Sequence, residues 1–273
     1  MKTKELMKKL EEGMTEVFNS ERYKDWLEVQ KNFRNYSYAN TMLILLQRPK
    51  ARQVAGYKTW QKLGRQVNKG EKGIKIFAPN IRKVEKKDQE TGEKVQKKEI
   101  KGFFPVSLFD ISQTSGEELP EIAQELEGDS DIAEYIYEKA KTIAEKDNLK
   151  VELYTEDERS SKGCYEPYNK IGIKEASKDQ QAKTIIHELT HHKTHEQVES
   201  YQEGEIIAES VAYIVCSSYG LDTSEYSFEY VAAWASNKQN TEPLKKVAGL
   251  IQKTADSIIK ELEAQDEKAA LAV

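Results

Sequence analysis

Hydrophobic residues follow two different spacings along the chain, and each spacing predicts a different kind of element. A spacing of three to four residues is typical of an amphipathic helix, and alternation is typical of a strand. The first pattern predicts helices over 4–18, 21–33, 38–47, 57–63, 131–146, 178–194, 204–218, 227–237 and 243–264. The second predicts strands at 74–76 and 81–84 with 99–111 as their partner, a short strand at 151–154, and a strand or hairpin at 165–173.

Between the hairpin and the helix at 131–146, Ser, Thr, Gly and Pro cluster in the stretch SQTSGEELP. Such residues favour turns and loops over regular structure. We therefore expect an α+β fold of two domains, with residues 1–112 and 121–273 joined by a linker at 113–120. The first domain would combine helices with a β-hairpin or small antiparallel sheet. The second would be mostly helical with a small sheet.

Composition narrows the class of protein. The chain has 273 residues, of which 38% are hydrophobic and 33% charged. Its apolar runs, such as Met42–Leu46, are far shorter than the roughly 20 residues of a membrane-spanning helix, and the charged start MKTKELMKKLEEGM lacks the apolar core of a secretory signal. We expect a cytoplasmic protein without a membrane partner. Cys164 and Cys216 lie in no CxxC pair, which favours two unpaired thiols.

A net charge of −5 conceals a strong asymmetry. Residues 1–110 hold 25 Lys and Arg against 14 Asp and Glu, whereas residues 111–273 hold 17 against 33. The two parts thus carry +11 and −16. The segment 31–83 contains thirteen basic side chains and one acidic side chain, Glu71. Opposite charges of this size indicate domains with different partners.

All four histidines lie in the stretch TIIHELTHHKTH, residues 184–195. His187 and His191 are four residues apart, so a helix would place both imidazoles on one face. With Glu188 between them they form HExxH, the motif of zinc hydrolases, in which the two histidines bind Zn²⁺ and the glutamate takes a proton from the activated water. His192 and His195 point to other faces, and we expect neither to be a ligand.

A catalytic zinc site requires a third protein ligand, and the segment EGEIIAESVAYIVC offers two carboxylates one helical turn apart. Glu209 lies among apolar residues, where an unpartnered carboxylate would be unstable. We therefore favour Glu209 as the third ligand and Glu205 as a group that orients a histidine. The reverse assignment stays open. Zn²⁺ is the expected ion, although another divalent metal would suit the same donors.

HELTH followed by EIIAES resembles the gluzincin branch of zinc metallopeptidases, whose third ligand is a glutamate on a later helix. The resemblance implies that His187, His191 and Glu209 are ligands and that Glu188 is the catalytic base. It also implies an edge strand above the site that holds the substrate backbone, for which residues 165–173 are suitably placed. Tyr165, Tyr201 and Tyr213 are candidate oxyanion donors, although a packing role is favoured for each.

The basic segment 35–79 combines cationic side chains with aromatic rings. Cationic groups neutralise phosphates, and exposed rings stack on unpaired bases, so the combination favours single-stranded over duplex nucleic acid. Aromatic residues at this spacing also suit a core, and a lysine-rich face is often only solvated. The candidate DNA-binding residues are Tyr36, Tyr38, Arg48, Lys50, Arg52, Tyr57, Lys58, Trp60, Lys62, Arg65, Lys69, Lys72 and Lys75.

The run YSYANTMLILLQRPKARQVAGYKTWQKLGRQVNKGEKGIKIFAP resembles the N-terminal domain of ArdC-type antirestriction proteins. The closing segment FEYVAAWASNKQNTEPLKKVAGLIQKTADSII resembles that family's last helices. The family pairs a domain that binds single-stranded DNA with a metallopeptidase-like domain. The resemblance therefore implies a protein of a mobile element, such as a plasmid, that helps incoming DNA evade restriction. The charged hairpin end at 85–98 matches no family feature that we can identify.

Two other functions fit these observations. The chain could shield DNA without enzymatic activity, with a metal site that only stabilises the fold. It could also be a regulatory peptidase that cleaves a repressor and uses the basic domain for targeting. A retained Glu188 and a three-ligand site argue against the first, because a purely structural zinc normally has four protein ligands.

Overall fold

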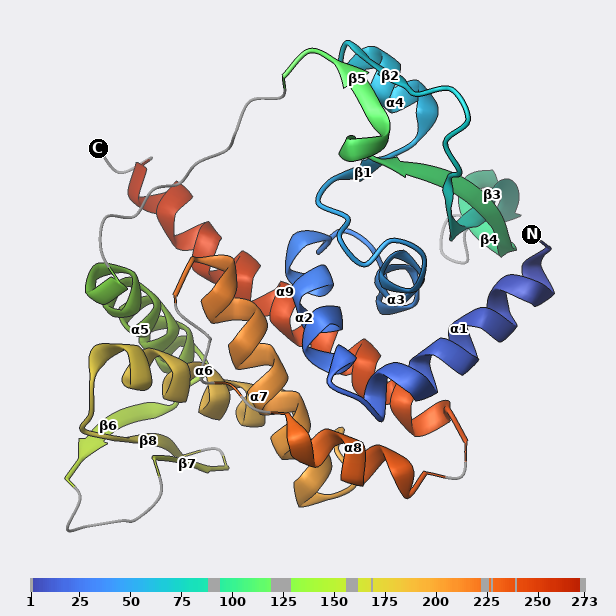
Figure 1. Cartoon of the computed structure of the whole chain (residues 1–273). Coiled ribbons are helices and arrows are strands. Elements are labelled where there is room, and N and C mark those ends of the chain that lie inside the picture. Colours follow the sequence, from blue (N-terminus) through green and yellow to red (C-terminus); the bar gives the residue numbers. More distant parts are fainter. Residues whose placement is uncertain are drawn as a thin grey trace. The chain divides into compact units, whose positions relative to one another are not determined.

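The computed structural model describes residues 2–87, 94–118, 129–155, 162–167, 169–221, 226, 228–238 and 240–270. The chain forms two compact units (Figure 1). Met1–Gly13 and Ala39–Pro120 form the first unit, and Met14–Tyr38 and Glu121–Val273 form the second. The helix α1, Thr3–Phe18, contributes to both units.

The first unit contains short helices and two small antiparallel sheets. Its helices are α3 (Tyr38–Gln47), α4 (Tyr57–Lys62) and the 3₁₀ turn η1 (Ile111–Gln113). The strands β1 (Val54–Ala55), β4 (Lys94–Asp110) and β3 (Ile74–Lys87) pair in that order, and β2 (Arg65–Val67) pairs with β5 (Thr114–Gly116). The side chain of Asn40 on α3 bonds both backbone groups of Phe77 at 2.9 Å, which ties the helix to the base of the hairpin.

The second unit is a set of packed helices with one small mixed sheet. Its helices are α2 (Arg22–Asn32), α5 (Asp129–Lys146), α6 (Lys178–Thr194), α7 (Tyr201–Ser218), α8 (Glu229–Ser236) and α9 (Glu242–Ala270). In the sheet, β8 (Lys170–Lys174) lies between β6 (Lys150–Tyr154), which is parallel to it, and β7 (Gly163–Glu166), which is antiparallel. Helix α6 packs on α5, α7 and the sheet (Figure 1).

The expected α+β class is confirmed, and several elements coincide with their predicted limits. Helices α3 and α6 begin and end at the predicted residues. The long hairpin forms as expected, although residues 88–93 of its charged end lie outside the described residues. The segment 165–173 is a hairpin whose edge strand begins at Gly163. Both cysteines are free thiols. No helix in the described ranges is long and apolar enough to cross a bilayer.

The expected domain division differs from the structure in one stretch. Residues 14–38 group with the second unit and not with the first. Helix α2 buries Tyr23, Trp26 and Leu27, and the Tyr23 hydroxyl bonds Ser210 on α7 at 2.8 Å. An amphipathic pattern shows that a face is buried but not which partner covers it.

The expected linker also differs. Its first residue, Gln113, ends the turn η1, and residues 114–116 are the strand β5, which pairs with β2. Residues 119–128, which include the end of the expected linker, lie outside the described residues.

Candidate metal centre and basic surface

Helix α6 carries the HExxH motif on a firmly packed segment. Its N-cap residue, Ser177, accepts a hydrogen bond from the backbone N–H of Gln180, as capping serines do. Ile185, Ile186 and Leu189 are fully buried, so the helix cannot rotate without exposing apolar surface. This packing leaves the face with His187 and His191 turned toward helix α7.

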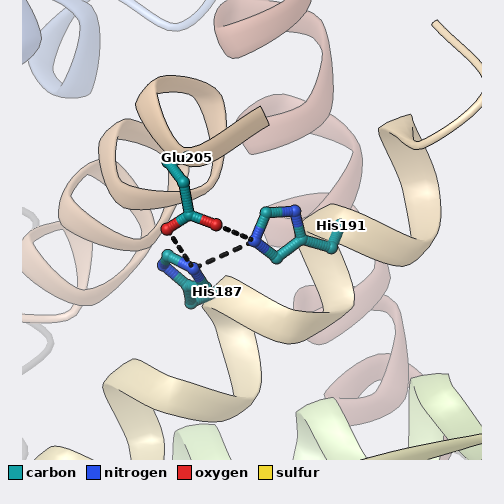
Figure 2. Close-up of side chains that lie close together, drawn as sticks. All are labelled: His187, His191 and Glu205. Atoms are coloured by element: carbon teal, nitrogen blue, oxygen red, sulfur yellow. Dashed lines mark hydrogen bonds and ion pairs between the residues drawn. The ribbon is translucent and has the colours of Figure 1, made fainter. Parts of the chain in front are cut away.

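Three side chains from α6 and α7 converge on one point (Figure 2). The Nε2 atoms of His187 and His191 are 3.1 Å apart. Glu205 places Oε1 3.2 Å from Nε2 of His191 and Oε2 3.6 Å from Nε2 of His187. Two imidazole nitrogens and a carboxylate oxygen are the ligands of His₂Glu zinc sites.

The separations suit a small tetrahedral ion. Ligand bonds of about 2.0–2.1 Å at tetrahedral angles place neighbouring ligand atoms about 3.3 Å apart. The Nε2 atoms are 3.1 Å apart, and each lies 3.2 or 3.6 Å from one of the two carboxylate oxygens of Glu205, close to that value. The residues present therefore fit a divalent metal of zinc's size.

Glu209, the third ligand favoured from the sequence, lies on the other side of His187 from Glu205. Its Oε2 lies 3.2 Å from Nδ1 of His187, the ring nitrogen that faces away from the other ligand atoms. Its Oε1 forms an ion pair with Lys183 at 2.6 Å. A carboxylate on the far nitrogen of a metal-binding histidine fixes the orientation and tautomer of the ring. Glu205 is thus the third ligand candidate, and Glu209 orients His187.

The two glutamates also set the charge of the triad. Burial disfavours the protonated imidazole of His187, but hydrogen bonds to Glu205 and Glu209 outweigh it and raise the pKa to about 9. Burial likewise opposes ionisation of Glu205, but its hydrogen bonds to His187 and His191 lower its pKa. Both carboxylates therefore favour a positive charge at this point of the cleft.

Glu188 lies beside the triad in an enclosed position. Its side chain is buried, and this burial raises the pKa of the carboxyl group. Gly163 of strand β7 lies directly against it, because a Cβ added there would clash with Oε1 of Glu188 and with Cγ2 of Thr184. A glycine at this position lets the strand approach the helix where the carboxylate lies.

A cleft of about 740 Å³ contains the triad, Glu188 and Glu209. Strand β7, the edge strand of the described sheet, contributes Gly163, Cys164 and Tyr165 to its wall. Extended peptides can bind by pairing with such an edge. The cleft is thus bordered by a strand edge as well as by the two helices.

The three candidate tyrosines have different surroundings. Tyr213 is buried, and its hydroxyl bonds Glu28. The Tyr165 hydroxyl lies 3.1 Å from Nδ1 of His192. Tyr201 is 80% exposed and lines the cleft, and the charge of Glu205, followed by burial, raises the pKa of its hydroxyl. Tyr201 is therefore not the packing residue that we expected.

The two remaining histidines lie outside the triad, as expected. His192 has Asp147 at 3.5 Å from its Nε2. His195 follows the last residue of α6, and its Nδ1 is 2.8 Å from the carbonyl oxygen of His192.

Most of the predicted basic contacts lie in the first unit and reach solvent. The exposed members are Lys50, Arg52, Lys58, Lys62, Lys69 and Lys72. Arg48, Lys75 and Arg65 are half-buried and have bonding partners inside the unit: Ser112 for Arg48, Ser107 for Lys75, and Thr114 and the Glu117 carbonyl for Arg65. The first group is available to a polyanion, whereas the second also holds the fold together.

The candidate aromatic residues likewise include both buried and exposed side chains. Trp60 is 1% exposed and donates its indole N–H to the Phe109 carbonyl at 2.8 Å, so it is a core residue and not a stacking surface. Tyr36 and Tyr38 belong to the second unit and are half-buried. Only Tyr57 among the four is exposed, at 43%.

A second cleft, of about 840 Å³, lies in the first unit between α3 and η1. Its wall includes Arg48, Lys50, Arg52 and Arg65. Asp110 at its base is 1% exposed and accepts backbone hydrogen bonds from Arg52 at 2.8 Å and Gln53 at 3.2 Å. The buried carboxylate fixes the loop that presents the basic side chains.

Comparison with known proteins identifies relatives of both parts. Residues 2–108 match the family model of the N-terminal domain of anti-restriction factor ArdC. A Bacillus anthracis protein named uncharacterized protein pXO2-81 is 31% identical over 303 residues, covering 96% of this chain and 51% of its own length. The chain thus spans about half the length of this curated relative.

Solved structures share the fold. The metal-free crystal structure of the antirestriction ArdC protein from the R388 plasmid is 21% identical with a TM-score of 0.57, covering 93% of this chain and 98% of that one. The Mn(II)-bound structure of that protein is 20% identical with a TM-score of 0.50, covering 87% and 97%. The resemblance expected from the sequence is confirmed.

Proposed function

We propose, from the premise that residues 2–108 form an ArdC-type N-terminal domain, that the chain is an antirestriction protein of a mobile element with two active parts. The basic unit binds single-stranded DNA, and the cleft of the second unit is a zinc-dependent peptidase site. One observation carries the second part: His187, His191 and Glu205 converge on one point beside a buried Glu188.

The donor set supports Zn²⁺ as the ion, held by His187, His191 and Glu205. Three protein ligands leave a position for a substrate or water, as in catalytic zinc sites. When bound, the ion would act as a Lewis acid toward water and a peptide carbonyl. Mg²⁺, Ca²⁺ and Mn²⁺ prefer oxygen-rich sites, whereas imidazole suits Zn²⁺ and other transition metals, so two imidazole ligands favour zinc over those three ions.

The residues around the triad have separable roles in hydrolysis. Glu188 would accept a proton from the attacking water and transfer it to the leaving amine, and its burial suits a carboxyl group that must hold that proton. Strand β7 would align an extended substrate by backbone pairing. Tyr201, which is exposed and lines the cleft, would donate to the developing oxyanion.

Binding of single-stranded DNA is supported by the charge and exposure of the first unit. The solvent-facing cations belong mainly to residues 39–83 of this unit. That segment contains one acidic residue, Glu71. A polyanion gains affinity from such a surface through release of counterions. Fluorescence anisotropy with a labelled oligothymidine tests this part, and absence of binding at low salt would remove it.

Paired variants test the metal and the chemistry separately. We expect His187→Ala to lose bound zinc, measured by elemental analysis, and Glu188→Gln to retain zinc. Casein hydrolysis by Glu188→Gln should fall by about 10²–10⁴-fold, the usual contribution of a general base. His195→Ala is the matched control, because this histidine also lines the cleft but lies outside the triad. Loss of zinc in Glu188→Gln, or full activity of either His187→Ala or Glu188→Gln, contradicts the assignment.

Transfer of a plasmid into a restricting recipient tests whether proteolysis serves antirestriction. A peptidase mechanism predicts that Glu188→Gln loses protection while it retains zinc and DNA binding. Protection equal to that of the unaltered protein would instead show that the chain shields DNA without hydrolysis. Accumulation of one host protein bound to Glu188→Gln would indicate the regulatory peptidase.

A further inference from the structure

The hairpin of β3 and β4 exposes large apolar side chains. Near its base the ladder is packed, with Ile74, Ile76 and Leu108 buried. Farther out, Ile81, Ile100, Phe103 and Phe104 are 53%, 59%, 58% and 47% exposed. A group of exposed apolar residues on a folded protein marks a binding surface more often than scattered ones do. We refer to residues 78–83 and 99–104 as the ribbon.

The register places the two phenylalanine rings on opposite faces of the ribbon. Phe103 pairs with Pro79, and Phe104 pairs with Ala78. Successive residues of a strand point to opposite faces, and paired residues share a face. A bulge between Pro79 and Ile81 follows, after which Ile81 pairs with Ile100. Each face of the ribbon therefore carries one exposed aromatic ring.

The charge of the same strands indicates the class of ligand. β3 and β4 together contain nine Lys and Arg against three Asp and Glu, one of which is the buried Asp110. Within the ribbon, Arg82, Lys83 and Lys101 are exposed, and Lys101 also forms an ion pair with Glu99 at 3.0 Å. Cations beside exposed rings fit a chain of phosphates with accessible bases, because the cations attract phosphates and each ring can stack on a base.

A membrane surface is the other polyanion that apolar and basic side chains could meet. An interfacial segment inserts one apolar face into the bilayer and keeps the opposite face polar. The ribbon carries a phenylalanine on each face, which leaves one ring outside the bilayer in either orientation. Duplex DNA presents no free base to a ring. The geometry therefore favours unpaired bases.

We propose that Phe103 and Phe104 form a stacking site for unpaired bases of single-stranded DNA, with Arg82, Lys83 and Lys101 beside the phosphates. This inference rests on the proposed function, because it assigns the place where the strand binds. The site lies outside the segment 35–79, where the sequence alone had indicated DNA contacts. In the sequence, the alternating pattern of a strand is equally consistent with phenylalanines that are buried in a core. Their exposure in the structure is what shows that Phe103 and Phe104 are available to a ligand.

The experiment measures anisotropy of labelled oligothymidine with the full chain and four variants. Phe103→Ala and Phe104→Ala should each weaken binding by about 5- to 150-fold, the range for loss of one base–ring stack. Phe103→Trp should retain the affinity. Ile100→Ala is the matched control, because it removes an equally exposed apolar side chain of the ribbon that has no ring, and it should change affinity by less than about 3-fold.

A second oligonucleotide with the same sugar-phosphate backbone but no bases separates stacking from charge. The unaltered protein should bind it more weakly than oligothymidine, whereas Phe103→Ala should lose much of that difference. If the unaltered protein binds oligothymidine and both alanine variants bind equally well, this inference fails while DNA binding stands. If the unaltered protein does not bind at low salt, the proposed function itself fails.

Phosphatidylserine vesicles test the other partner in the same preparations. Cosedimentation that depends on Phe103, with oligothymidine affinity unchanged in Phe103→Ala, would overturn the inference in favour of a membrane. Loss of affinity in Ile100→Ala as large as in Phe103→Ala would overturn it as well, because general hydrophobicity and not stacking would then be responsible. Equal melting temperatures of the variants show that the fold is intact.

Discussion

The cleft of the second unit and the basic surface of the first unit use charged side chains in opposite ways. In the cleft, the carboxylates of Glu205 and Glu209 have cationic or imidazole partners within 3.6 Å, and α6 and α7 hold them in place. On the basic surface, Lys50 and Arg52 extend into solvent. Chemistry at a metal requires fixed ligand geometry, whereas attraction of a polyanion requires only a local excess of charge.

The largest expected effect distinguishes the two glutamates of the cleft. Glu205→Gln removes a ligand and should weaken zinc affinity by more than about 100-fold. Glu209→Gln removes only the carboxylate that orients His187, for which a loss of about 10- to 100-fold is typical. Competition with a fluorescent chelator measures both values. A larger loss of zinc affinity in Glu209→Gln would show that Glu209 is the ligand and Glu205 the orienting group, as favoured from the sequence.

A smaller effect tests how the basic surface is supported. Asp110→Ala leaves the backbone N–H groups of Arg52 and Gln53 without their acceptor, which should destabilise the first unit by about 2–3 kcal/mol. Hydrogen exchange of residues 51–54 measures this locally. Asp110→Asn is the graded control, because it retains one acceptor oxygen, and it should lose less stability.

The same carboxylate predicts a dependence of stability on pH. Burial opposes its ionisation, but bonds from Ser112, Arg52 and Gln53 outweigh burial and lower the pKa of Asp110 below 3.8. The ionised group therefore stabilises the first unit at pH values above about 4, and this contribution disappears as the pH falls through the lowered pKa. Exchange protection in Asp110→Ala should accordingly lack this acid-dependent step. If exchange protection depends on pH identically in the unaltered protein and in Asp110→Ala, Asp110 does not have this role.

The smallest effect concerns the exposed cations themselves. The double variant Lys50→Gln with Arg52→Gln should weaken oligothymidine binding only several-fold at moderate salt. Its slope of log affinity against log salt should become shallower by up to about 1.4, since each phosphate contact on a single strand contributes about 0.7. Lys246→Gln in the second unit is the control with one cation removed outside the basic surface. An unchanged slope in the double variant would exclude this pair from the contact.

Some residues of the fold and the site could be predicted because their signals are local. Helix α3 ends before Pro49, and α6 begins after the capping Ser177, so both limits follow from neighbouring residues. The His187 and His191 pair follows from a spacing of one helical turn. The partner strands β2 and β5 were not predicted, because three-residue strands separated by some fifty residues leave no periodic pattern.

The sequence by itself determined the HExxH helix, the charge asymmetry and the α+β class, because periodicity, capping and composition depend on neighbouring residues alone. Only the tertiary structure decided that Glu205 lies at the Nε2 atoms of both histidines while Glu209 lies at Nδ1 of His187. It also decided that α2 packs on α7, and that Trp60 is buried while Phe103 is exposed. The physical reason is common to all of these. Two glutamates one turn apart, or two aromatic residues in amphipathic segments, are equivalent until packing against a distant element selects one of them.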